Sequence, residues 1–199
     1  MLDIFFRGGP LMYPILFCSI IGWAIFMERF YAYFLIRRDL LRLRSSTLSY
    51  LREGRDEEAI RLCSEKSSPL ARILLVVLTN RGQQRAHLKA LAEEVGGRVA
   101  VELQRYLGLL ATIANVAPLL GLLGTVLGMI NAFNVIAAEG VGTPATLGGG
   151  ISEALITTAA GLSVAVPMLL VHRYLSARSD RLLLELEEAS MQVVDLIEG

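Results

Sequence analysis

The 199-residue chain is 54% hydrophobic, 19% charged and of positive mean hydropathy, +0.54. An ordinary soluble domain is about 25% charged, with its charges interspersed, so a soluble single-core enzyme is a poor fit. The formal net charge of zero gives no basic field for nucleic acid, and no finger-like Cys/His spacing is present. A nucleic-acid-binding protein is therefore excluded as well.

The charges avoid three stretches of the chain. Residues 8–27 and 106–138 carry none, and between Arg105 and Arg173 the formal charges are Glu139 and Glu153. Apolar runs of about 18 residues or more indicate membrane-spanning helices. We therefore predict an all-α integral membrane protein with three transmembrane helices.

The first span is predicted to lie within residues 1–36, from about Pro10 to Leu35. No small-x-small cleavage site follows the apolar run, so we interpret it as a retained anchor, not a signal peptide. Glu28 and Arg29 interrupt it late, and we expect both to snorkel to the headgroup boundary.

Residues 37–105 have an amphipathic, helical pattern interrupted by Gly54, by Ser67–Pro69 and by Gly82. The interruptions predict short helical hairpins. Asp56 is predicted to cap one helix, and Ser68 with Pro69 to open the next.

Basic residues predict the orientation, because Lys and Arg beside a span stay in the cytoplasm. Segment 37–105 holds 14 of them, whereas residues 138–146 hold none. We expect the N-terminus and a loop at 139–146 to be periplasmic, and residues 37–105 and the C-terminal helix at 173–199 to be cytoplasmic.

The second span, 106–138, has 33 uncharged residues. A helix of that length is about 50 Å long, whereas the hydrocarbon core of a bilayer is about 30 Å thick, so part of the helix must lie outside the lipid. We expect it to continue residues 85–105 as one long rod. The third span, 147–172, is expected to start near Thr143–Pro144 and to extend into the C-terminal helix in the same way.

Small residues in these two spans predict close helix packing. Gly124 and Gly128 have the small-xxx-small spacing that lets backbones approach. Pro118 and Pro167 each remove an intrahelical hydrogen bond and can kink the helix. The packing candidates are Gly121, Gly124, Gly128 and Gly161.

Glu153 is the most informative polar residue. If its helix begins near Pro144, Glu153 lies about 13 Å along it, where a carboxyl must be protonated, partnered or facing water and could relay protons. If the helix begins only at Ser152, Glu153 is an interfacial first-turn carboxylate. Spacing alone leaves both interpretations open.

The remaining reactive side chains predict no metal site and no cofactor. His87 and His172 lie near no cluster of ligands, and Cys18 and Cys63 fall in different environments, where we expect both thiols to be reduced.

Two runs of sequence carry a family resemblance. Residues 117–130, APLLGLLGTVLGMI, followed by Phe133, resemble the second span of the ExbB/TolQ/MotA proton-channel family, and residues 153–162, EALITTAAGL, through Pro167 resemble its third span. Three spans and a modest cytoplasmic segment place the chain nearer the ExbB/TolQ branch than the MotA branch.

The resemblance implies an inner-membrane motor driven by the proton-motive force, with protons as the coupling ion. It implies a homo-oligomeric ring, usually a pentamer, around a dimeric, single-span ExbD- or TolR-like partner, with a TonB- or TolA-like protein downstream. By matching position, Thr125 and Thr158 would line the proton path with Glu153.

Residues 153 and 158 diverge by about 140° on an ideal helix, so Thr157, which faces closer to Glu153, is a secondary candidate. The competing hypothesis is a passive scaffold that holds a single-span partner without conducting protons. The choice between an ExbB role and a TolQ role is open at this point.

Overall fold

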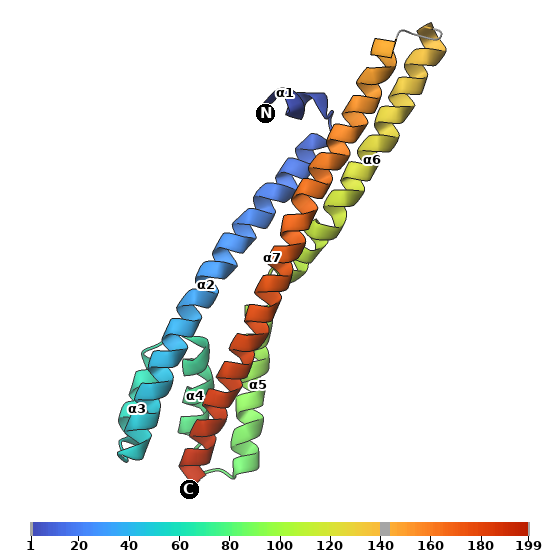
Figure 1. Cartoon of the computed structure of the whole chain (residues 1–199). Coiled ribbons are helices and arrows are strands. Elements are labelled where there is room, and N and C mark those ends of the chain that lie inside the picture. The colour runs from blue at the N-terminus through green and yellow to red at the C-terminus, as the bar shows by residue number, and fades with distance from the viewer. Residues whose placement is uncertain (1, 140–143, 199) are drawn as a thin grey trace. The chain divides into compact units, whose positions relative to one another are not determined.

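The computed structural model describes residues 2–139 and 144–198, and the side chains of 5–138 and 148–197. These residues form helices and no strands (Figure 1), which confirms the all-α prediction. In chain order the helices are α1 (Leu2–Arg7), α2 (Met12–Arg52), α3 (Asp56–Ser64), α4 (Pro69–Thr79), α5 (Arg85–Leu103), α6 (Leu107–Glu139) and α7 (Pro144–Glu198).

Three helical segments are long and apolar enough to cross a membrane. They lie in α2, in residues 85–138 and in α7, at mean hydropathies of 1.5, 1.9 and 2.1. A third or less of each membrane-length segment is buried within one copy of the chain (22%, 33% and 28%). Their remaining apolar surface requires lipid or other protein around it.

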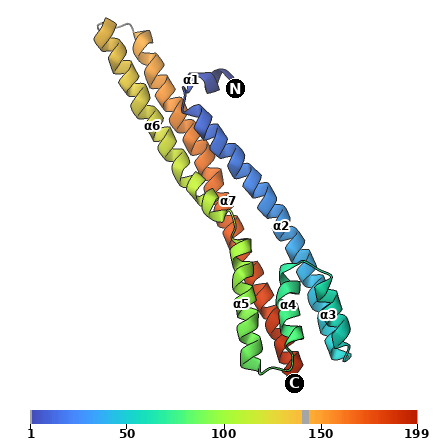
Figure 2. The same cartoon turned by 180° about the vertical axis from the view of Figure 1, so that it is seen from behind.

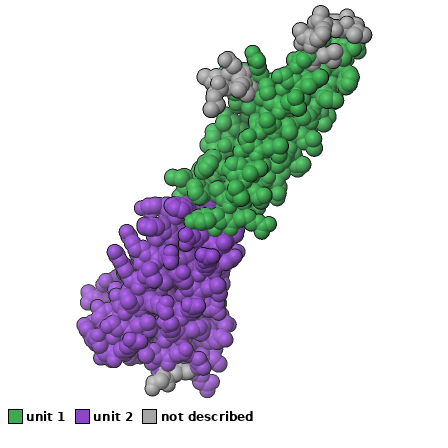
Figure 3. Space-filling view, in the orientation of Figure 1, with its two compact units in different colours: residues 1–27, 106–174 green, residues 28–105, 175–199 purple. Residues whose placement is uncertain are grey.

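The chain divides into two compact units (Figure 3). The membrane unit comprises residues 1–27 and 106–174, and the charged unit comprises residues 28–105 and 175–199. Both α2 and α7 contribute to each unit.

In the membrane unit, α6 and the first part of α7 run antiparallel side by side, as both Figure 1 and Figure 2 show. The start of α2 packs on α7, where Gly22 leaves room for the side chain of Met168. Small buried residues of α6 face α7: Ala117, Gly121, Gly124, Gly128 and Ala132.

In the charged unit, α4 packs against both α3 and α5. Its buried face carries Leu70, Leu74 and Val77, as expected for an amphipathic helix. In α3, Cys63 is buried with its Sγ 3.9 Å from Thr47 Oγ1, and burial raises the pKa of its thiol.

One predicted helix cap is confirmed and one is wrong. Ser68 is the N-cap of α4, with Pro69 as its first residue, and Ser68 Oγ accepts from the Ala71 backbone N–H at 3.4 Å. Asp56 is instead the first residue of α3, after Arg55. Its carboxylate pairs instead with Arg81, in the connection between α4 and α5, 25 residues further along the chain.

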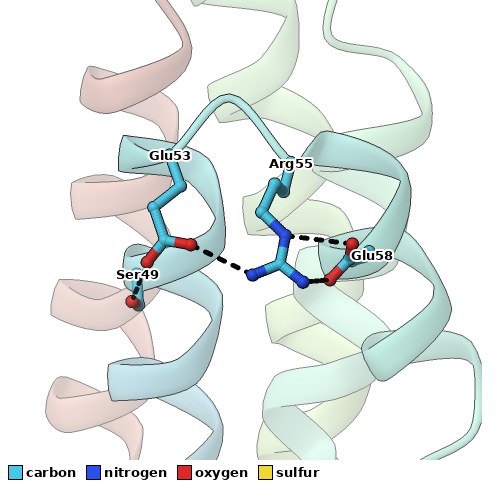
Figure 4. Close-up of polar contacts among 4 residues, drawn as sticks. All are labelled: Ser49, Glu53, Arg55 and Glu58. Atoms are coloured by element: carbon cyan, nitrogen blue, oxygen red, sulfur yellow. Dashed lines mark hydrogen bonds and ion pairs between the residues drawn. The ribbon is translucent and has the colours of Figure 1, made fainter.

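An ion-pair cluster closes the turn between α2 and α3 (Figure 4). Arg55 donates to Glu58 and, at 3.1 Å, to Glu53, while Ser49 donates to Glu53 at 2.9 Å. The Arg55 guanidinium lowers the pKa of the Glu53 carboxyl. Gly54 in this turn has φ +71°, a conformation that glycine adopts without strain.

The continuous rod predicted for residues 85–138 is interrupted. Helix α5 ends at Leu103, α6 begins at Leu107, and Tyr106 has φ +67°. The reason lies in α2: Arg29 Nη1 donates to Glu102 O at 3.1 Å, and Tyr33 Oη donates to Leu103 O at 2.6 Å. In an unbroken helix these carbonyls would accept from the N–H groups four residues later.

Arg29 is therefore not the snorkelling residue that we predicted. It is only 9% exposed, and its guanidinium bonds Glu28 as well as the end of α5. A cation at the C-terminus of a helix interacts favourably with the helix dipole. The long-range acceptor on α5 explains why arginine occupies this position in an apolar helix.

Candidate functional site

The predicted packing glycines lie in the contact between α6 and α7. A Cβ added at Gly161 would lie 2.6 Å from Ala117 O and 3.0 Å from Gly121 Cα. One added at Gly128 would lie 2.8 Å from Gly150 O, and one at Gly124 would lie 2.6 Å from Thr157 Cβ. The backbones meet because these side chains are hydrogen atoms.

Pro118 and Pro167 lie inside α6 and α7, and neither ends its helix. Both are half-buried. Each leaves one carbonyl of the preceding turn without its helical N–H donor. The predicted kink at each proline stays a prediction.

Thr157 is the buried junction of the membrane unit, at 1% exposure. Its Oγ1 lies 2.6 Å from Gly8 O and 2.8 Å from Glu153 O, so one hydroxyl proton is shared between the carbonyl before α2 and that of its own preceding turn. Its methyl group lies against Gly124 of α6. One side chain of α7 thus contacts both α6 and the turn before α2.

Thr158 and Thr125 are both half-buried and have different partners. Thr158 Oγ1 donates to Gly121 O on α6 at 2.9 Å, whereas Thr125 Oγ1 donates within its own helix to Leu122 O at 2.6 Å. The Thr158 hydroxyl therefore donates to α6, whereas the hydroxyl of Thr157, the next residue, donates to the Gly8 carbonyl before α2.

Glu153 lies well inside a helix. Because α7 begins at Pro144, the alternative in which the helix starts at Ser152 is wrong. The Glu153 side chain is half-buried, and its carboxyl lies against Gly9: a Cβ added there would collide with Oε1 and lie 3.0 Å from Cδ.

Sequence reasoning missed Gly8 and Gly9, which form the turn before α2. Gly9 has φ +71°, and Gly8 is buried with its carbonyl on Thr157. The Gly8–Gly9–Pro10 run is a turn signal in the sequence, but nothing local shows that residue 153 contacts it. Within the described part of the chain, no group of three or more His, Cys, Asp or Glu side chains could hold a metal ion.

The site thus combines one carboxyl group and three hydroxyl groups on two apolar helices, α6 and α7. The groups belong to Thr125, Glu153, Thr157 and Thr158. Comparison with known families gives it a context: residues 65–188 match the MotA/TolQ/ExbB proton channel family. The chain belongs to this family. The resemblance seen in the two sequence runs is thereby confirmed.

Relatives extend the match beyond these residues. The chain is 38% identical over 185 residues to the biopolymer transport protein ExbB-like 1 of Synechocystis sp., covering 88% of the chain and 70% of the relative. It is 42% identical over 117 residues to the biopolymer transport protein exbB1 of Vibrio cholerae, covering 56% of the chain and 51% of the relative. It is 43% identical over 82 residues to the Tol-Pal system protein TolQ of Pseudomonas aeruginosa, covering 41% of the chain and 36% of the relative.

The family and the three apolar helices together identify a multi-pass inner-membrane protein of the MotA/TolQ/ExbB proton channel family. Members of this family are transport and channel proteins.

Proposed function

We propose that the chain is one subunit of a motor that couples proton flow down the proton-motive force to mechanical work on the cell envelope. The observation that carries this proposal is Glu153, an ionisable group half-buried ten residues into α7 of a proton channel protein. Ionisable side chains inside membrane spans mark proton or ion pathways.

We propose further that several copies form a closed ring, a pentamer, around the spans of a dimeric ExbD/TolR-like partner. Support comes from the apolar side chains of α6 and α7 that one copy leaves exposed, including Leu119, Leu122 and Leu155. A ring covers part of this surface with neighbouring copies, and lipid covers the rest.

In the proposed mechanism, a proton passes Glu153 and the hydroxyls of Thr125 and Thr158 and reaches a carboxylate of the partner. Neutralising that carboxylate removes the cost of turning a charge through an apolar interior. One charge moved across 100 mV supplies about 2.3 kcal/mol, so a few protons per step suffice for mechanical work. The work passes to a TonB- or TolA-like protein.

The proposed orientation follows from the basic residues, with the N-terminus periplasmic and the C-terminus cytoplasmic. Glu153 then lies toward the periplasmic end of its span, because it is nearer the start of α7 than the arginines at 173 and 178.

The test reconstitutes the chain with its ExbD/TolR-like partner in vesicles and measures internal pH under an imposed voltage. Glu153→Gln, Thr125→Val and Thr158→Val are expected to abolish proton flux while the purified complex keeps its mass. Thr112→Val is the matched control, because Thr112 also donates within α6, to Gly108 O at 2.9 Å, and is exposed.

A passive scaffold predicts a different result. Flux would then be absent from the wild type, a protonophore would leave envelope function untouched, and Glu153→Gln would alter stability alone. Wild-type flux in all three variants would remove these residues from the pathway.

A further inference from the structure

The turn that precedes α2 is fixed by its own backbone. Gly8 N donates to Phe5 O at 3.2 Å, and Met12 N donates to Gly9 O at 3.2 Å. Gly9, at φ +71°, lies in the left-handed region. The turn is thus a defined structure between α1 and α2, with a conformation that favours glycine.

This turn touches α7 at two positions one helical turn apart. Gly8 O accepts the Thr157 hydroxyl at 2.6 Å, and Gly9 provides the space that the Glu153 carboxyl occupies. Residues i and i+4 lie on the same helix face, so the two contacts hold the turn in register with that face.

We propose that Gly8 and Gly9 are positioning residues for the Glu153 carboxyl, and that Thr157 anchors them. This inference rests on the proposed function, in which the Glu153 carboxyl takes part in proton transfer. Gly9 keeps the carboxyl in place because no side chain competes for its space. The Thr157–Gly8 hydrogen bond keeps the turn against α7. The turn forms one wall of the Glu153 site and shields the carboxyl on that side.

Gly9→Ala tests the wall directly. The added methyl group meets the Glu153 carboxyl and displaces it from the turn. Gly54→Ala is the matched control, because Gly54 has the same φ of +71° but nothing within 4 Å of an added Cβ. Both variants place alanine at a positive φ and carry the same kind of backbone strain. Only Gly9→Ala adds a contact with the Glu153 carboxyl.

The readout is the rate at which Glu153 forms an adduct with dicyclohexylcarbodiimide, a probe of carboxyl groups in apolar surroundings. Mass spectrometry of the full-length chain measures the amount of adduct, and the part that is absent from Glu153→Gln is assigned to Glu153. Gly9→Ala is expected to react several-fold faster than the wild type, and Gly54→Ala at the wild-type rate. An unchanged or slower rate in Gly9→Ala, or an equal increase in Gly54→Ala, overturns the proposal.

A double-mutant comparison covers the case in which Gly9→Ala is poorly folded. Glu153→Asp shortens the side chain by one methylene and withdraws the carboxyl from the added methyl group. Gly9→Ala is expected to lower Tm more than Gly54→Ala in the wild-type background and equally in the Glu153→Asp background. A Gly9→Ala penalty that is the same in both backgrounds contradicts a contact with Glu153.

Thr157 provides an independent arm. Thr157→Val keeps the shape but removes the donor to Gly8 O, and it is expected to raise the labelling rate of Glu153 several-fold. Thr157→Ser keeps the hydroxyl and is expected to label at the wild-type rate. Equal rates in Thr157→Val and the wild type overturn the anchoring role.

Failure of this inference is distinguishable from failure of the proposed function. The labelling rates and the Tm comparison need no proton flux, so they report the Gly9–Glu153 contact even in a chain that conducts nothing. Flux that survives Glu153→Gln would refute the proton pathway and leave the contact to be judged by the labelling alone.

Discussion

The effect of a glycine-to-alanine substitution in this protein depends on which atoms lie next to the added methyl group. Gly148 and Gly161 both belong to α7, but an added Cβ at Gly148 meets nothing within 4 Å, while one at Gly161 meets the backbone of α6. The same substitution should therefore have different effects on stability at the two positions.

Gly161→Ala is expected to destabilise the protein by about 1–3 kcal/mol, because backbone atoms cannot move aside for the methyl group. Gly148→Ala is expected to be neutral or to stabilise by up to about 1 kcal/mol through helix propensity. Thermal unfolding of the detergent-purified chain measures both. Equal Tm values for the two variants would contradict the close approach of α6 and α7.

A single ion pair in the charged unit predicts a pH dependence. Arg72 donates to Glu102 through Nη1 at 2.8 Å and lowers the pKa of that carboxyl below its ordinary value of 4.5. The folded state therefore favours ionised Glu102. This contribution is fully present above the unfolded pKa and disappears as the pH falls through the lower folded value.

Glu102→Gln is expected to reduce stability by less than about 1 kcal/mol at neutral pH, because both side chains are largely exposed. The difference from the wild type is expected to shrink as the pH falls from about 5 toward 3. Unfolding curves at a series of pH values measure it. A difference that grows on acidification would contradict the lowered pKa.

At the scale of helices, the ends are determined by side chains that bind backbone groups. Ser68 satisfies a free N–H at the start of α4, and Arg29 and Tyr33 satisfy carbonyls at the end of α5. The first contact is local in the sequence and the second is not.

Ser68→Ala is expected to cost about 1 kcal/mol, the usual effect of removing an N-cap. Ser64→Ala is the control, since its hydroxyl donates to Arg61 O of the same helix, and it should change stability by less than about 0.5 kcal/mol. Chemical or thermal unfolding distinguishes them. Equal losses would deny the capping role.

Tyr33→Phe removes one hydroxyl and leaves the Leu103 carbonyl without this donor in a buried position. A cost of about 1–3 kcal/mol is expected. Tyr31→Phe is the matched control in the same helix, with Tyr31 67% exposed against 6% for Tyr33. If Tyr33→Phe unfolds at the wild-type temperature, the bond does not stabilise the end of α5.

At the scale of the whole molecule, the membrane-length segments leave most of their apolar surface uncovered by one copy. Lipid alone could cover this surface, but in the proposed ring neighbouring copies cover part of it, including Leu119, Leu122 and Leu155.

The purified complex is therefore expected to have a mass that is a multiple of 21.7 kDa, five-fold for the proposed pentamer before any partner is counted. Native mass spectrometry from detergent measures the copy number directly. A species of 21.7 kDa that persists at high protein concentration would contradict the ring.

The sequence alone determined the features that rest on local chemistry. Uncharged runs predicted the three spans because lipid excludes charge, and Ser68–Pro69 predicted a helix start because the cap contacts its own helix. The two span motifs indicated the family, and glycine spacing indicated close packing. Only the tertiary structure decided what each polar group meets across the fold: Asp56 binds Arg81, Arg29 and Tyr33 end α5, and Glu153 lies against Gly9. Such contacts join residues up to 149 positions apart, and periodicity carries no information about partners at that separation.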